Sequence, residues 1–173
     1  RANDTIAAAD RLLATMDDVE MAGQIEAHAI KALWHNGGFA EMTERTDRAL
    51  QLVAGRADLA ARFRAARALA STRLADADAA VEEADTALAL ARASGDHDAL
   101  AFGLQAAGEA AHTQRRHQVA LTYFRELRTV SGISYLADEI MQLQLLDRYD
   151  HAQLLLDAAR ADCSSTADAL PPS

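Results

Sequence analysis

The chain of 173 residues is poor in cysteine, proline and aromatic side chains. Its single cysteine, Cys163, excludes a disulfide framework and a metal site built from several thiolates. A lone thiol favours a reducing compartment, so we expect a cytoplasmic location. The two prolines, Pro171 and Pro172, lie at the end of the chain, and proline therefore interrupts no helix before them.

Positive charge is also scarce. The formal net charge is −9, the sequence pI is about 5.0, and Lys31 is the only lysine. A surface that binds nucleic acid directly needs a cluster of cations, so this composition argues against one. No apolar run approaches the roughly eighteen residues of a membrane-spanning helix, and we expect no membrane partner.

What the chain does have is alanine, together with apolar residues at helical spacing. Alanine is the best helix former, and β-branched residues, which favour strands, are sparse. Leu100, Leu104, Ala107 and Ala111 form one stripe on a helical face. The composition and the spacing together predict an all-α chain.

A repeat of forty residues organises the sequence. Ala40, Ala80 and Ala120 each follow a predicted turn and open a similar helix, and Ala152 repeats the pattern after a shorter step of thirty-two. A fixed period of this size is typical of a solenoid, in which each repeat packs on its neighbours.

Glycines and polar residues at the predicted turns set the boundaries of the helices. Gly37, Gly55, Gly95 and Gly132 suit the left-handed conformation that ends a helix, and Asp96 can cap the next one. We expect one domain of about nine helices over residues 4–163. It comprises a leading helix near 4–16, hairpins at 18–54, 57–94, 97–131 and 133–163, and a tail or linker at 164–173.

The hairpin at 97–131 carries the best match to a known pattern. Leu104-x-x-Ala107-Gly108-x-x-Ala111 is followed by Ala120-x-x-x-Phe124, with Leu127 one turn later. This resembles the tetratricopeptide repeat, in which small residues lie where two helices cross and an aromatic residue lies one turn on. The resemblance implies a right-handed superhelix of antiparallel helical hairpins.

The length of the repeat suggests a narrower resemblance. A forty-residue period and segments such as 84–96 are similar to the central helical region of large LuxR-type ATP-dependent transcriptional regulators, including the maltose activator. In that family the repeats sense an effector or a partner protein, between an ATPase module and a helix-turn-helix. The resemblance implies that ATP binding and DNA binding belong to parts outside this segment.

The first helix of each hairpin is expected to line a concave groove, the surface that such folds use for binding. The register set by Gly108 and Ala120 places polar and aromatic residues toward the C-terminal part of this groove. Such a surface suits a protein, a peptide or a small polar effector; alternatively, it is merely solvated. The candidate binding residues are Arg62, Phe102, Gln105, Glu109, His112, Met141 and Gln144.

Other kinds of site have weaker support. Glu109-x-x-His112 resembles half of a di-iron site, but the chain has no second pair of this kind, so we expect no metal and no cofactor. Trp34 is expected to be a core anchor. We expect no catalytic activity, and we expect that exposed end helices could support a homodimer.

The first functional hypothesis is therefore a ligand- or protein-binding module of a LuxR-type regulator. The alternative is a free-standing tetratricopeptide scaffold with no link to transcription. A third and weaker hypothesis is an all-helical enzyme whose groove uses His112.

Overall fold

The computed structural model describes residues 2–16 and 18–168. These residues form nine α-helices and one short 3-10 helix and include no strand, which confirms the all-α helical-repeat prediction. The elements are α1 (Ala2–Leu13), α2 (Val19–Asn36), α3 (Phe39–Leu52), α4 (Ala57–Arg73), α5 (Ala77–Ser94), α6 (His97–Thr113), α7 (His117–Ser131), η1 (Gly132–Tyr135), α8 (Leu136–Leu145) and α9 (Tyr149–Asp168).

Most helices begin and end at the predicted turns. Asp96 caps α6 as expected, because its Oδ1 accepts a hydrogen bond from the Ala99 amide at 2.7 Å. Gly37 and Gly95 end α2 and α5 in the left-handed conformation, with φ of 73° and 69°. The capping residues therefore fix the hairpin boundaries.

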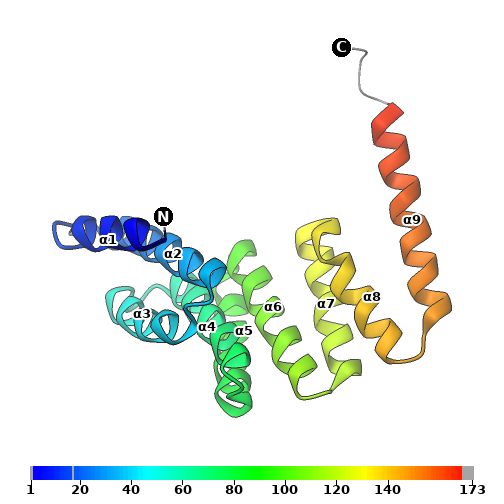
Figure 1. The fold of residues 1–173 in the computed structure, drawn as a ribbon, viewed down its shortest axis with the longest axis horizontal. Helices are drawn as coiled ribbons and strands as arrows, with labels where there is room; N and C mark the ends of the chain where they lie inside the picture. The colour runs from blue at the N-terminus through cyan, green and yellow to red at the C-terminus, as the bar shows by residue number, and fades with distance from the viewer. Residues whose placement is uncertain (1, 17, 169–173) are drawn as a thin grey trace.

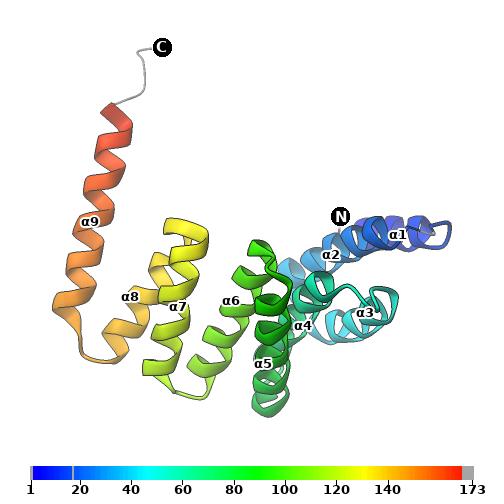
Figure 2. The ribbon, with the colours of Figure 1, turned by 180° about the vertical axis from the view of Figure 1, so that it is seen from behind.

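Successive helices run back and forth as hairpins along an elongated array (Figures 1 and 2). In the middle of the array, α4 packs against both α5 and α6. Buried alanines supply much of this interface, including Ala65, Ala68, Ala84 and Ala107. Small side chains allow the helix axes to approach closely, and the largest core cluster lies here.

Gly108 of α6 lies at a close crossing with α7. A Cβ atom added at Gly108 would lie 2.7 Å from Cε1 of Phe124. Phe124 is fully buried. The absent side chain therefore makes room for an aromatic ring.

The C-terminal repeat departs from the expected boundaries. The helix expected from residue 133 begins as the 3-10 turn η1, and α8 proper covers only Leu136–Leu145. Helix α9 continues to Asp168, so the tail expected to begin at residue 164 is helical over its first five positions. Residues 169–173 of that tail lie outside the described residues.

Apolar side chains are exposed mainly at the two ends of the array. Leu12, Met21 and Leu52 lie near the N-terminal end, and Tyr149 and Leu154 near the C-terminal end. Such surfaces are compatible with the expected homodimer, which stays a prediction. No helix among the described residues is long and apolar enough to cross a membrane.

Candidate functional site

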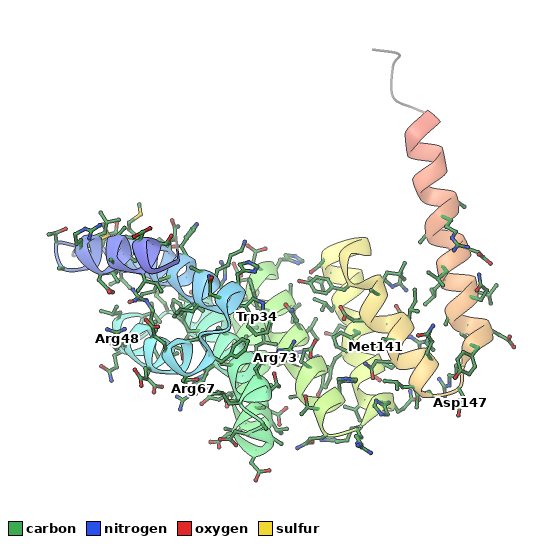
Figure 3. All side chains as sticks on the ribbon, in the orientation of Figure 1. Trp34, Arg48, Arg67, Arg73, Met141 and Asp147 are labelled. Carbon is green, nitrogen blue, oxygen red and sulfur yellow. The ribbon has the colours of Figure 1, made fainter. Side chains whose placement is uncertain are left out.

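The candidate site lies on one face of the array, to which α2, α4, α6, η1 and α8 contribute. We call it the inner face; Figure 3 labels Trp34, Arg73 and Met141 on it. Its residues, named from α2 to α8, are Trp34, Arg73, Phe102, Gln105, Glu109, His112, Tyr135, Asp138 and Met141.

An aromatic ring and a guanidinium form the N-terminal part of the inner face. The Arg73 guanidinium carbon lies 5.3 Å from the centre of the Trp34 ring. At this distance the cation is attracted to the face of the indole. Trp34 also packs edge-on against Phe39, with ring centres 5.5 Å apart. Trp34 is half-buried and contacts two core clusters, so it serves as an anchor and also contributes to the surface.

Two carboxylates from different helices occupy the middle of the inner face. Glu109 on α6 and Asp138 on α8 are both half-buried, and neither has a hydrogen-bond donor or an ion-pair partner among the described residues. Burial raises the pKa of Glu109, although Arg73 partly opposes this effect. Burial also raises the pKa of Asp138, with His112 opposing it. Each group therefore carries its negative charge at a cost in solvation.

Tyr135 of η1 lies beside this pair. Burial raises the pKa of its hydroxyl, and the nearby charge of Asp138 raises it further. The neutral phenol can donate a hydrogen bond to an acceptor. The tyrosine therefore adds an aromatic surface and a polar group to the acidic centre.

A buried glutamine orients His112. Nδ1 of His112 lies 3.0 Å from the amide nitrogen and 3.4 Å from the amide oxygen of Gln142, and Nδ1 of His117 lies 3.1 Å from the same oxygen. Gln142 is fully buried. Its amide group therefore holds the ring of His112 through Nδ1 and leaves Nε2 available to a ligand.

Four of the predicted residues share one face of α6 by their helical spacing. Phe102, Gln105, Glu109 and His112 follow one face of α6, and Phe102 is 45% exposed. Met141 lies one turn after Asp138 on α8 and is half-buried. These positions agree with the helical register that the sequence supplied.

Arg62 and Gln144 lie apart from the acidic centre. Nη2 of Arg62 contacts Oδ1 of Asp96 at 2.8 Å and Oδ2 of Asp98 at 3.5 Å, at the start of α6. Glu109 follows nearly four helical turns later. Gln144 is exposed near the end of α8. Arg62 therefore joins α4 to α6 and does not contribute a free charge.

Sequence reasoning missed Arg73, Tyr135, Asp138 and Gln142. The step of thirty-two residues leads from Gln105 to Ala137, which is exposed and lies one residue before Asp138. The chain before α8 forms the 3-10 turn η1, where the sequence predicted a continuous α-helix. Gly132, with φ of 80° and ψ of −158°, was the available signal of this change.

The described residues hold no group of three or more histidine, cysteine, aspartate or glutamate side chains that could bind a metal ion. Asp138 is the further carboxylate that acts electrostatically together with Glu109 and His112. The arrangement instead offers two unpaired carboxylates, an oriented imidazole and aromatic surface. These groups suit the recognition of a cation with an apolar environment.

No protein-family model matches the chain, and no curated protein matches it. Among solved structures, the chain is similar to the crystal structure of BtubC (BKLC) from P. vanneervenii, with a TM-score of 0.71 and 11% sequence identity. The match covers 92% of this chain and 69% of that one. At this identity the likeness concerns the fold alone.

Proposed function

We propose that this chain is a binding module that takes a protein, a peptide or a small effector on its inner face. The observation that supports it most directly is the pair Glu109 and Asp138. Two half-buried carboxylates that have no hydrogen-bond or ion-pair partner among the described residues lose hydration in the free protein, and a bound cation would compensate for that loss. The favoured ligand group is an arginine or lysine side chain, or an organic amine.

The surroundings of the two carboxylates support a peptide. The exposed ring of Phe102 and the rings of Trp34 and Tyr135 offer apolar surface on both sides of the acidic centre. Side chains from α2, α6 and η1 are spaced along the array, as an extended ligand requires. We propose binding without catalysis, in a cytoplasmic setting and without direct contact to nucleic acid.

A pair of test peptides examines this proposal. One is a short fluorescent peptide with an arginine between two leucines, and the other carries neutral citrulline in place of arginine. We expect the arginine peptide to bind more tightly. The double variant Glu109→Gln/Asp138→Asn should weaken its binding about tenfold, the usual effect of losing charged hydrogen bonds.

A matched control separates local recognition from overall charge. Glu82→Gln/Asp85→Asn removes the same two charges from exposed positions on α5. We expect this variant to bind the arginine peptide as the parent does. Equal binding of the two peptides, or equal losses in the two double variants, would contradict the proposal.

For the biological context, we propose that the module belongs to a LuxR-type ATP-dependent regulator. The forty-residue period and the segment 84–96 support this choice. The alternative remains a free-standing tetratricopeptide scaffold. The gene sequence on either side of Arg1 and Ser173 distinguishes them: a phosphate-binding loop upstream and a helix-turn-helix downstream would support the regulator. Flanks without both features would favour the scaffold.

A further inference from the structure

A cleft lies between α7, α8 and α9. Its volume is about 430 Å³. Arg125 and Arg128 of α7, Glu139 of α8 and His151 of α9 form its polar part. Three helices therefore contribute charged or polar side chains to one open cleft.

The two arginines share one buried carboxylate. Glu139 is only 2% exposed; its Oε1 accepts from Nε of Arg125 at 3.0 Å, and its Oε2 from Nε of Arg128 at 2.7 Å. Each guanidinium uses only its Nε in this way, so the Nη groups of both have no acceptor among the described residues. Glu139 fixes the two side chains while one positive charge remains in excess.

This excess is unusual within an acidic protein. In the other ion pairs of the described residues there is at least one carboxylate for each arginine, as for Arg62 with Asp96 and Asp98. Glu83 also meets two arginines, Arg64 and Arg67, but Arg67 has Asp47 as a further partner. The cluster at Glu139 thus differs from the other ion-pair clusters in its charge balance.

The remaining wall of the cleft is aliphatic. Leu143, which is fully buried, and Leu154 and Leu155 of α9 line the cleft. Leu154 is 65% exposed. A ligand that matches this cleft carries one negative charge next to an aliphatic group. A dianion such as phosphate would bring a second negative charge that the single excess positive charge does not compensate.

We propose that the cleft between α7, α8 and α9 binds an aliphatic monocarboxylate. The free Nη groups of Arg125 and Arg128 donate to the carboxylate, and His151 lies close enough to line the same cleft. The leucines cover the aliphatic part. The carboxylate can come from the C-terminal residue of a peptide or from a small free acid.

Titrations followed by two-dimensional NMR test the proposal with two acids and their neutral analogues. The probes are acetyl-Ala-Leu-Leu as the free acid and as the C-terminal amide, and hexanoate and 1-hexanol. We expect at least one acid to bind, and its neutral analogue to bind about tenfold more weakly. Binding of the peptide acid alone identifies a peptide terminus, and binding of hexanoate alone identifies a free acid.

Three substitutions should change the affinity for the acid in different directions. Arg125→Gln and Leu154→Gln should each weaken binding of the acid about fivefold or more, because one loses a donor and the other loses apolar contact. Glu139→Gln should strengthen it, because the buried negative charge is removed while the arginines remain. A purely structural ion cluster would not produce this reversal. Circular dichroism checks that each variant is folded.

Matched controls come from a similar cleft at the other end of the array. Arg48 and Leu52 line a cleft of about 390 Å³ between α1, α2 and α3, together with the carboxylates of Asp10 and Glu26. We expect Arg48→Gln and Leu52→Gln to leave binding unchanged. The proposal is overturned if neither acid binds below about 10 mM, if the neutral analogues bind equally, or if the control variants give the same losses.

Discussion

The close approach at Gly108 gives the sharpest test of the packing. In the variant Gly108→Ala, the new Cβ would lie 2.7 Å from Cε1 and 2.8 Å from Cζ of Phe124. Carbon atoms pack favourably at about 3.5–4.0 Å, so the ring or the helix must move by roughly 1 Å. Phe124 is fully buried in the largest core cluster, which leaves the ring little space to move.

Two opposing effects decide the sign of the change. Overpacking a core costs about 1–3 kcal/mol, whereas replacing glycine by alanine within a helix gains about 0.5–1 kcal/mol. We therefore expect Gly108→Ala to lower the free energy of unfolding by about 1–2 kcal/mol. In a chain of this size that lowers the Tm by roughly 2–8 °C.

Urea denaturation followed by circular dichroism measures the effect. Gly23→Ala is the control, because its nearest neighbour is the flexible end of Leu59, with Cδ1 at 3.0 Å. There we expect no loss, or a gain of up to about 1 kcal/mol. In a Phe124→Leu background the loss at Gly108 should disappear. A Gly108→Ala protein that is more stable than the parent would refute this account of the crossing.

Three further predictions concern charged groups. Glu109→Gln should stabilise the protein at pH 7, because the pKa of Glu109 is raised in the folded state and its ionised form therefore opposes folding. In thermal melts, this advantage of the variant should disappear as the pH falls to the ordinary range of a glutamate pKa. Asp96→Ala should cost about 1–2 kcal/mol near neutral pH, because α6 loses its cap and Arg62 its main partner. Since the pKa of Asp96 is lowered, this loss should diminish in acid, and an effect independent of pH would contradict the reasoning. Arg45→Met should cost about 3–5 kcal/mol in urea denaturation, because it leaves the buried carboxylate of Glu26 without its cation; a variant as stable as the parent would contradict this.

The sequence predicted the helices because their ends are encoded locally. Asp96 follows Gly95 directly, so the end of α5 and the cap of α6 are both visible in two adjacent residues. Gly108 and Ala120 then set the register, which placed Glu109 and His112 on one face of α6. Helix boundaries and the residues that share a helical face could therefore be predicted from the sequence, because both depend on residues that are close along the chain.

The inner face could be predicted only in part, because its centre joins residues from separate repeats. Asp138 of α8 acts electrostatically on Glu109 of α6, and the fixed step along the sequence led to its neighbour Ala137. The role of Gln142 depends on two histidines, 30 and 25 residues away. Partnerships over such distances leave no periodic signal in a single sequence.

The attachment of α9 has a consequence for how the protein unfolds. Within the described residues α9 packs chiefly on α8, whereas α4 contacts helices on more than one side. In an array of repeats, stability is close to a sum of terms between nearest neighbours. The backbone amides of α9 should therefore exchange with solvent well before those of α4 to α6, through fraying of the last hairpin. A carboxylate held between α7 and α9 would oppose this fraying, so occupancy of the cleft would be measurable as slower amide exchange along α9.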